Sequence, residues 1–589
     1  MLLIECGLVI AAVIVALAYP TFGSRWFTPC ERIFVAIARR KPLSVVLVGL
    51  VALALRTAVL PILPIPKPGV SDEFSFLFMA DTFAHGRLTN PTHPMWVHFE
   101  TFGVLQKPTY SSMYYPAQGA MLAAGQLLLG HPFWGICLSA AIMSASICWM
   151  LQGWLPPFWA LIGGLLVVVR LATFSYWVNS YFGGCLAAIG GALVLGALPR
   201  IKRHQRIGHS LLMGVGFLIL ANTRPYESLF FCFPVAVVLF VWLFGQRTQR
   251  LRVTLRQVVI PLGLLLLITA GGIAYYFWRV TGSPLRNPYT VSLEQYFVTP
   301  YFPWQPLRSI PAYHHEILQK SYTGWPLDLY HMNREHPIMS AIIKMDILWF
   351  FYLGPLFTLP VLLLAVILPR GFGFKDISRR SRFLLTVAGF TSLAAMLPIF
   401  CSPHYIAPLV CLIYALLLAA LQRIRKWRWR GKPTGLAIVR AVPIVALVLL
   451  VLCVVAPALH IENSPAPWTW CSPWNQVVNR AVIQAHVENL PGRYLLLVRY
   501  GSQHDSRESW VFNRADIDHS KVVWANDMGP EQNQELIDYF KDRQVWLVEP
   551  DAMPARISTY LNDMPRQTSL PMKSEPPVPV LQERAHASH

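Results

Sequence analysis

Two adjacent carboxylates, Asp72 and Glu73, are the residues of this sequence best suited to chemistry. They follow an apolar stretch at 43–63 and a proline-rich segment that runs from Pro64 to Pro68. A carboxylate at the end of a membrane span costs free energy unless water solvates it or a reaction uses it. A carboxylate in this place could act as a general base that removes a proton from an attacking hydroxyl group.

The segment that contains this pair, residues 64–115, is more polar than a simple connection between spans needs to be. Its other ionisable residues include Asp81, His85, Arg87, His93, His98, Glu100 and Lys107. A base together with cationic groups predicts an active-site loop for an anionic substrate. The alternative is a solvated loop that caps a helical bundle, and the residues alone leave both interpretations open.

The histidines of this loop could bind a metal together with Glu100, but their spacing is poor for it. His85, His93 and His98 are not four residues apart, and prolines break the loop between them. Histidines that bind one metal from a helix face are usually at i and i+4. Surface or capping roles are the better interpretation, so no metal site is predicted.

The composition indicates the class of protein that holds these ionisable groups in place. Of the 589 residues, 55% are hydrophobic and 13% are charged, against roughly 25% charged residues in soluble proteins. Apolar stretches of about 20 residues recur along most of the chain, which is typical of a helical membrane protein that crosses the bilayer many times. The alternating ten-residue segments of a membrane β-barrel are not visible.

The net charge of +20 is unevenly distributed, and its distribution argues against a nucleic-acid partner. Residues 459–589 hold 12 Lys and Arg and 16 Asp and Glu, a net charge of −4, so the membrane part carries +24. The basic residues cluster in short segments, which are 25–41, 200–206, 247–256, 370–382 and 422–432. Such clusters are typical of cytoplasmic loops.

The fold class predicted is a polytopic α-helical membrane protein with about twelve spans. We place the spans at 2–19 (uncleaved), 43–63, 133–151, 155–171, 181–198, 207–221, 227–244, 258–279, 346–369, 383–400, 403–421 and 437–458. The apolar run 117–130 is only about 14 residues long, the length of an interfacial or re-entrant helix. If it does not cross, every basic loop lies in the cytoplasm.

With that topology, the polar and aromatic loops collect on the outer face. Loop 280–345 is long and rich in aromatic residues, so we expect it to be folded. Short outer loops add Arg170, Tyr176, Asn179, Tyr181, Asn222, Arg224, Tyr226, Glu227, Arg279, Arg286, His404 and Tyr405. Each fits interfacial anchoring when taken alone. Several cations together on the face opposite the basic loops fit interfacial anchoring less well. Arg224 and His404 are therefore candidate phosphate contacts.

The C-terminal region differs in kind from the membrane domain at 1–458. Segments 494–499, 521–525 and 544–548 are predicted to be short buried strands, with a helix at 530–540. This pattern predicts a small α/β domain at 459–563 on the outer side of the membrane. The tail at 564–589 is rich in proline and polar residues and is expected to be disordered.

The ten cysteines are scattered, mostly within apolar stretches, and contain no CxxC pair. Neither a zinc site nor a disulfide framework is predicted from them. Cys401 and Cys471 are placed in the same compartment by the predicted topology, but nothing else supports a bridge between them.

Three short motifs occur in a recognisable order. Asp72-Glu73 follows an early span, and Lys107-Pro108 and Tyr114-Tyr115-Pro116 open the short apolar helix. His404-Tyr405-Ile406-Ala407-Pro408 opens a late span. In order and topology they resemble the C-type (GT-C) superfamily of polytopic glycosyltransferases. The resemblance covers roughly residues 43–460 and is closest to the branch that holds protein O-mannosyltransferases and lipid A aminoarabinose transferases.

The resemblance implies an enzyme of the inner (plasma) membrane. It would transfer a sugar from a polyprenyl-phosphate-linked donor to a lipid, glycan or protein acceptor on the outer face. Asp72 would be the general base and Glu73 would orient it or the substrate. The substrate and phosphate contacts would be Lys107, Tyr115, Asn179, Arg224, His404 and Tyr405.

Two departures from that superfamily bear on the chemistry. Asn179 stands where many relatives have an Asp that can help to bind a metal, and an amide is a weaker ligand for a hard cation. The resemblance therefore leaves dependence on a divalent cation open. His404 stands where many relatives have Arg, and a His contact to phosphate would be sensitive to pH.

Two other classes of function stay open from the sequence. One is a transporter or flippase of a lipid-linked or anionic substrate, although the internal repeats and mid-membrane polar groups of many transporters are not visible. The other is a binding or assembly protein that uses its C-terminal domain on a degenerate membrane scaffold.

Overall fold

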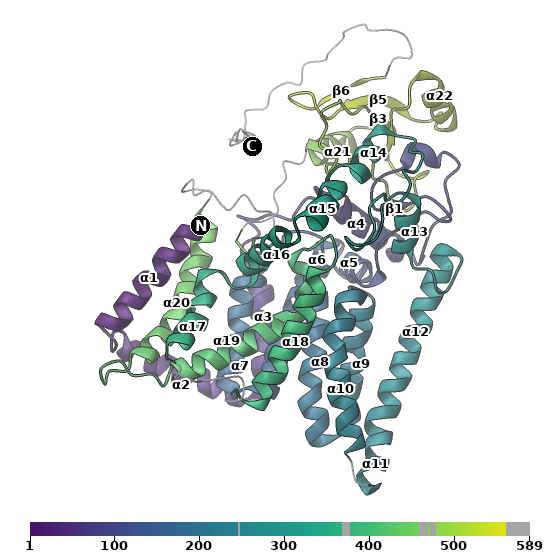
Figure 1. Cartoon of the computed structure of the whole chain (residues 1–589). Helices are drawn as coiled ribbons and strands as arrows, with labels where there is room; N and C mark the ends of the chain where they lie inside the picture. The colour runs from purple at the N-terminus through teal and green to yellow at the C-terminus, as the bar shows by residue number, and fades with distance from the viewer. Residues whose placement is uncertain (246–247, 368–376, 457–458, 460–468, 472–478, 561–589) are drawn as a thin grey trace.

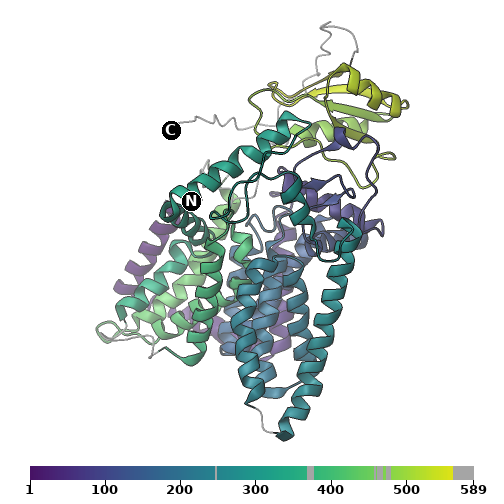
Figure 2. The same cartoon turned by 45° about the vertical axis from the view of Figure 1, so that its right-hand side comes forward.

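The computed structural model describes residues 1–245, 248–367, 377–456, 459, 469–471 and 479–560. These residues form a helical bundle with a small α/β domain at one end (Figure 1). The α/β domain sits at the same end of the bundle when the molecule is turned by 45° (Figure 2). The predicted disordered tail, 564–589, lies outside the described residues.

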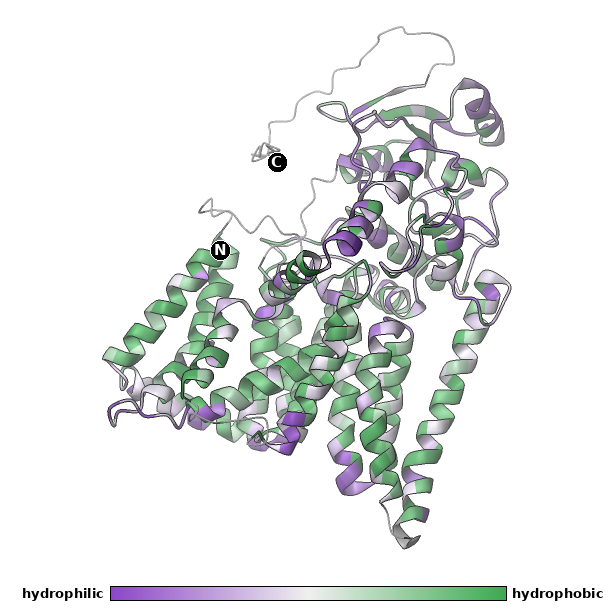
Figure 3. Ribbon diagram, in the orientation of Figure 1, coloured by the Kyte–Doolittle hydropathy of each residue, from purple (hydrophilic) through white to green (hydrophobic). Residues whose placement is uncertain are grey.

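Eleven of the twelve predicted spans overlap a single helical segment of the described chain, whereas span 346–369 falls across two helices that meet at a bend. The helices of the bundle are α1 (Leu2–Ala18), α2 (Ser24–Arg39), α3 (Lys41–Ala58), α6 (Phe133–Trp154), α7 (Pro157–Leu171), α8 (Gly184–His204), α9 (Ile207–Ala221), α10 (Pro225–Phe244), α11 (Thr248–Thr254), α12 (Ile260–Thr281), α16 (Pro337–Tyr352), α17 (Gly354–Ile367), α18 (Arg379–Met396), α19 (Val410–Ile424) and α20 (Thr434–Val455). Their middle parts are apolar and the polar residues lie toward the two ends (Figure 3).

By length and hydropathy, seven of the described helices could cross a membrane. The number becomes eight if α16 and α17, which meet at a bend of 98°, count as one broken span. Helices α1, α7 and α9 are apolar but shorter. The count of twelve crossings therefore stays a prediction.

Two segments predicted as loops are helical. Residues 25–41, expected to be a basic loop, contain most of α2, whose polar and apolar residues lie on different faces. The carboxylate pair, expected in an irregular loop, lies in the first turn of α4 (Ser71–Ala84). A short 3-10 turn, η1 (Trp96–Phe99), and a small hairpin of β1 (Val104–Leu105) and β2 (Ser111–Ser112) complete that segment.

The short apolar run forms α5 (Pro116–Leu129), which packs closely between α4 and α6. Glycines permit this approach. A Cβ atom added to Gly125 would lie 2.1 Å from the backbone nitrogen of Gly135 in α6, and one added to Gly119 would lie 2.3 Å from the sulfur of Met79 in α4. Both contacts are too short for any side chain, so α4 is held firmly at the end of the bundle.

The long aromatic loop is folded, as expected. It contains α13 (Pro288–Gln295), α14 (Glu316–Thr323) and α15 (Trp325–Glu335). Further along the chain, α19 is preceded by a 3-10 segment, η4 (Pro403–Leu409), which carries the His404-Tyr405 motif.

The C-terminal domain has the three predicted strands and the predicted helix, together with two elements that were not predicted. Its elements are α21 (Asn479–Asn489), β3 (Tyr494–Val498), β4 (Val522–Asn526), α22 (Pro530–Tyr539), β5 (Gln544–Glu549) and β6 (Arg556–Thr559). The sheet order is β4-β3-β5-β6. β3 pairs in parallel with β4 and β5, and β6 is antiparallel.

One disulfide corrects the sequence-based prediction for the cysteines. Cys471 is bonded to Cys453 near the end of α20, with their Cα atoms 5.7 Å apart, whereas Cys401 is a free thiol. The bridge ties residue 471, on the chain leading to the C-terminal domain, to the last helix of the bundle. It was missed because Cys453 lies inside an apolar stretch, where cysteine usually acts as a small hydrophobic residue.

Candidate active site

Helix α4 begins where it does because Glu73 caps it. The Oε2 atom of Glu73 accepts hydrogen bonds from the backbone N–H groups of Gly69 (2.9 Å) and Val70 (3.3 Å). Carboxylates in the first turn also interact favourably with the positive end of the helix dipole. This capping fixes the direction in which the neighbouring side chain, Asp72, projects.

Glu73 itself is fully buried and holds two segments together. Its other oxygen, Oε1, accepts a hydrogen bond from the backbone N–H of Tyr181 at 3.1 Å. Burial raises the pKa of Glu73 to about 7, although the three amide donors act in the opposite direction. Glu73 therefore positions α4 against the loop at 172–183, and its carboxylate is not exposed to a substrate.

Asp72, in contrast, is only partly buried. The hydroxyl of Tyr114 donates a hydrogen bond to Asp72 Oδ1 at 2.6 Å. Burial raises the pKa of the Asp72 carboxyl, while the hydrogen bond from Tyr114 and the positive charge of Arg224 favour its ionised form. A carboxylate that is accessible and held by one donor is suited to accept a proton.

Tyr114 is placed by the β1–β2 hairpin. Ser75 of α4 donates to the carbonyl of Gly103 at 2.7 Å and also bonds the Ser112 hydroxyl at 2.7 Å. The backbone N–H of Tyr114 in turn donates to Ser112 Oγ. The Tyr114 ring stacks on Phe76 with ring centres 4.6 Å apart, so the hydroxyl has a fixed position beside Asp72.

Arg224 brings a cation to the same place from a distant part of the chain. It is the N-terminal capping residue of α10 and is half-buried. Its guanidinium lies over the Tyr405 ring, 4.0 Å from the ring centre. It also interacts electrostatically with Asp72 and with the buried carboxylate of Glu227. The carboxylate and the guanidinium thus belong to one cluster.

Three tyrosines complete this cluster, which we call the Asp72 cluster: Asp72, Tyr114, Arg224, Glu227, Tyr289 and Tyr405. All of its members except Glu227 are partly exposed. In the sequence, Tyr114 belongs to a motif, Glu227 to a short outer loop and Tyr289 to the aromatic loop 280–345, but none of them had a predicted role. The adjacent Tyr114-Tyr115 pair was the available signal, but it did not tell which hydroxyl faces Asp72.

His404 and Asn179 lie behind the cluster and are buried. The Tyr176 hydroxyl accepts a hydrogen bond from the His404 backbone N–H at 3.0 Å and lies 2.9 Å from His404 Nδ1. The amide of Asn179 donates to the carbonyls of Thr173 (3.2 Å) and Ser175 (2.9 Å). These contacts support the loop at 172–183 rather than offer groups to a substrate.

Lys107 and Tyr115 lie at the edges of the arrangement. The ammonium of Lys107 sits over the Trp96 ring, 4.0 Å from its centre, and interacts with Glu100. Lys107 therefore joins the contacts beneath the C-terminal domain rather than the described contacts of Asp72. The hydroxyl of Tyr115 interacts with Glu227, and burial raises the pKa of Tyr115 to about 12.

The residues considered as metal ligands have separate partners. His85 bonds the carbonyl of Asp81, His93 bonds Asp518, and Glu100 accepts hydrogen bonds from Tyr296 and His314. Within the part of the chain that the structure describes, no group of three or more His, Cys, Asp or Glu side chains is arranged to hold a metal ion.

Comparison of the sequence with known protein families and with curated proteins finds no match. Among solved structures, the chain is similar to ArnT from Cupriavidus metallidurans in the apo state, with 14% identity, a TM-score of 0.43, and coverage of 89% of this chain and 93% of that chain. It is also similar to the archaeal oligosaccharyltransferase AglB from Archaeoglobus fulgidus in complex with an inhibitory peptide and a dolichol-phosphate. There the identity is 11%, the TM-score 0.40, and the coverage 86% of this chain and 69% of that chain.

Proposed function

We propose that this protein is a membrane glycosyltransferase that uses a polyprenyl-phosphate-linked sugar as donor. The observation that carries the proposal is the Asp72 cluster, in which a partly exposed carboxylate and a partly exposed guanidinium interact at one end of the bundle. Transfer to a hydroxyl needs a base for the acceptor and a cation for the phosphate that leaves. The cluster offers one of each.

The proposed reaction inverts the sugar in one step. Asp72 takes the proton of the acceptor hydroxyl as the hydroxyl oxygen forms a bond to the anomeric carbon of the donor. The bond from that carbon to the phosphate oxygen breaks, and its electron pair stays on the polyprenyl phosphate. Arg224 stabilises the added negative charge. Because Tyr114 occupies Oδ1, the proton is taken by Oδ2 of Asp72.

The remaining candidates support this step in different ways. Glu73 and Asn179 keep α4 and the loop at 172–183 in position. His404 lies behind Arg224 and interacts with it electrostatically. Tyr405 holds the guanidinium by its ring face, an arrangement worth about 0.5–2 kcal/mol.

The location at the outer face rests on two features. The basic clusters predict that the opposite ends of the spans face the cytoplasm. The disulfide between Cys453 and Cys471 lies on the side of the C-terminal domain, and disulfides persist in oxidising compartments outside the cytosol. Lipid-linked sugars are the donors that a bundle of membrane helices can reach from that side.

The test is mass spectrometry of glycans and glycolipids from cells that lack the chain and are complemented with variants. Asp72→Asn should abolish the product, with a rate loss of about 10²–10⁴-fold for the purified enzyme, because the base is lost. Expression and donor binding should be unchanged. Glu294→Gln, an exposed carboxylate in the same outer region, is the matched control and should restore the product fully.

Product at the wild-type level with Asp72→Asn would rule out this residue as the base. Uptake of a lipid-linked or anionic substrate into vesicles, with no glycan product in any strain, would instead favour a transporter.

A further inference from the structure

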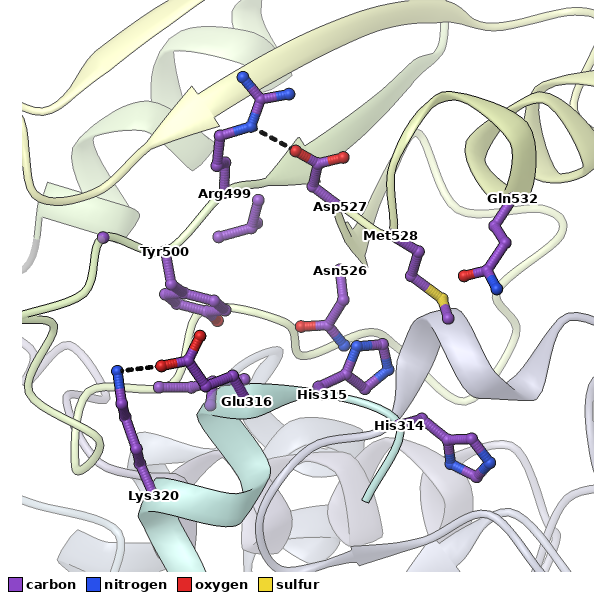
Figure 4. Close-up of a pocket in the computed structure, with 13 residues that line it drawn as sticks. His314, His315, Glu316, Lys320, Arg499, Tyr500, Asn526, Asp527, Met528 and Gln532 are labelled. Carbon is purple, nitrogen blue, oxygen red and sulfur yellow. Dashed lines mark hydrogen bonds and ion pairs between the residues drawn. The ribbon is translucent and has the colours of Figure 1, made fainter. Parts of the chain in front are cut away.

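A pocket of about 230 Å³ lies where the C-terminal sheet meets the long outer loop (Figure 4). One wall is formed by residues that follow the carboxyl ends of β3 and β4, and the other by α14. In open α/β sheets, ligands bind outside the carboxyl ends of parallel strands, where the strand order reverses. The pocket lies at the carboxyl ends of two such neighbouring parallel strands, β3 and β4, next to the reversal between β3 and β5.

The two walls are held together by direct bonds. The ammonium of Lys320 donates to the carbonyl of Ser502 at 2.9 Å, and the Ser321 hydroxyl donates to the carbonyl of Ser506 at 3.0 Å. The Asn526 amide at the base donates to the carbonyls of His98 and Glu100. Residues of both the membrane domain and the C-terminal domain therefore form the pocket.

The cations that line the pocket are already paired with carboxylates. Arg499 Nε lies 2.5 Å from Asp527 Oδ2, and Lys320 Nζ lies 2.7 Å from Glu316 Oε1 (Figure 4). The second oxygen of Asp527 accepts bonds from the Gly529 backbone and the Asn533 amide, so a carboxylate already occupies the start of α22. An anionic ligand would face these carboxylates, so the pocket disfavours phosphate.

The same groups suit a neutral ring that carries hydroxyls. Each paired cation and carboxylate presents a donor beside an acceptor, and a hydroxyl group needs both. Gln532 adds an exposed amide, and the Tyr500 ring adds a flat apolar wall. The Tyr500 hydroxyl accepts a bond from the Trp510 backbone N–H, which fixes that ring. The volume is below the roughly 300–1,000 Å³ of pockets for drug-sized ligands, so it suits a single sugar ring.

We infer that this pocket binds a neutral sugar residue of a glycan acceptor. The inference rests on the proposed function, because it assigns the acceptor class of that reaction. The C-terminal domain packs directly on α4, which carries Asp72, through Phe512 stacked on Phe74 with ring centres 4.5 Å apart. A glycan held in the pocket is thereby anchored at the same end of the bundle as α4, where α14 and β3 also lie (Figure 1).

The test is saturation-transfer NMR on the full chain in lipid nanodiscs. The probes are neutral trisaccharides of glucose, galactose, mannose and N-acetylglucosamine, with inorganic phosphate as competitor. At least one trisaccharide should bind, and phosphate should not displace it. Gln532→Ala should weaken binding at least five-fold, and Met528→Trp, which fills the pocket, should abolish it. Gln534→Ala, the same residue type two positions further along α22 and outside the pocket lining, should bind as the wild type does.

The inference is overturned if no trisaccharide binds, if the Gln532 and Met528 variants bind as the wild type does, or if phosphate displaces the sugar. Thermal unfolding of each variant separates loss of the pocket from loss of the fold. Asp72→Asn should leave sugar binding intact. Sugar binding without any transfer by the wild type would refute the proposed function alone. Transfer that requires Asp72 but proceeds at the wild-type rate in the Gln532 and Met528 variants would refute this inference alone.

Discussion

Asp72 and Glu73 are neighbours in sequence with opposite environments. The Glu73 carboxylate is enclosed by three backbone donors, whereas that of Asp72 is partly exposed and bonded by one tyrosine hydroxyl. The bonds to Glu73 hold the backbone at the start of α4, whereas the single bond to Asp72 leaves its Oδ2 atom able to accept a proton. Changes at Asp72 should therefore appear in assays of sugar transfer, whereas changes at Glu73 should appear in measurements of stability.

Removing the Tyr114 hydroxyl should shift the pH dependence of transfer. In Tyr114→Phe the ring still stacks on Phe76, but Asp72 loses a donor that stabilises its ionised form. The pKa of Asp72, already raised by burial, then rises further. A base works only when deprotonated, so the acidic limb of kcat/KM should move to higher pH, by about one to two units. An unchanged limb would show that this hydrogen bond does not act on the base.

Glu73 should contribute to stability in a pH-dependent way. Burial raises its pKa in the folded protein to about 7, above the usual 4.5. The protonated form is therefore favoured by folding, so the contribution is full below about pH 4.5 and is lost as the pH rises through about 7. Thermal unfolding between pH 5 and 8 should show this loss for the wild type. Glu73→Gln should flatten it and lower stability by about 1–3 kcal/mol, because backbone donors lose their acceptor. Equal slopes for both proteins would contradict the assignment.

At the residue level, the sequence pointed to Asp72 as the candidate base and to Arg224 as a candidate cation, but not to their partners. Asp72 and Arg224 were identifiable because a carboxylate beside a membrane span is costly unless it is solvated or used, and because Arg224 lies on the face opposite the basic loops. Tyr114 could not be separated from Tyr115, since the hairpin decides which ring faces α4. Lys107 follows the motif order, yet its contacts are with Trp96 and Glu100, which no short motif encodes.

At the level of elements, α4 is the helix on which both domains meet. Phe512 of the C-terminal domain stacks on Phe74, and the guanidinium of Arg480 lies over the Phe74 ring, 4.6 Å from its centre. The Ser71 and Ser509 hydroxyls bond at 3.0 Å, and the Ala515 backbone N–H donates to Asp81. The C-terminal domain is therefore part of the support for the base, not a separate appendage.

Phe512→Ala should loosen this docking. A buried Phe changed to Ala loses about 3–5 kcal/mol of stability, here at the contact between the domain and α4. We expect faster proteolysis between the bundle and the domain, together with slower sugar transfer at unchanged donor affinity. Met553→Ala, at a side chain that is 99% exposed in the same domain, is the control. Full transfer by Phe512→Ala despite an undocked domain would show that the domain serves recruitment only.

The elements themselves were largely predictable, with physical reasons for the exceptions. Long apolar stretches indicate helices, and short continuous apolar runs bounded by turn residues indicate buried strands. Helix α4 was not predicted because it is buried on nearly every side, so its residues show no polar face. Helix α2 was not predicted because Pro29 and the basic residues of this segment are typical of a loop. The short strand β6 pairs antiparallel at the sheet edge and has little burial to mark it.

At the level of the whole molecule, the sidedness of the membrane domain can be tested through the disulfide. Cys453 and Cys471 should resist a membrane-impermeant maleimide in intact cells and react only after reduction. Replacing both with Ser should lower stability by about 3 kcal/mol, as expected for a closed loop of this length. Labelling that requires a permeabilised membrane would place this end of the bundle in the cytoplasm and would reverse the topology.

The order in which the chain is made gives the docking of α4 a further meaning. Ser71 is bonded to Ser509, which is 438 residues further along the chain. A ribosome finishes α4 and inserts most of the bundle long before it adds the segment that covers this helix. Nascent or prematurely terminated chains therefore hold Asp72 without its cover. Under the proposed function, only a completed polypeptide has a fully supported base, so unfinished copies in the membrane should consume little donor.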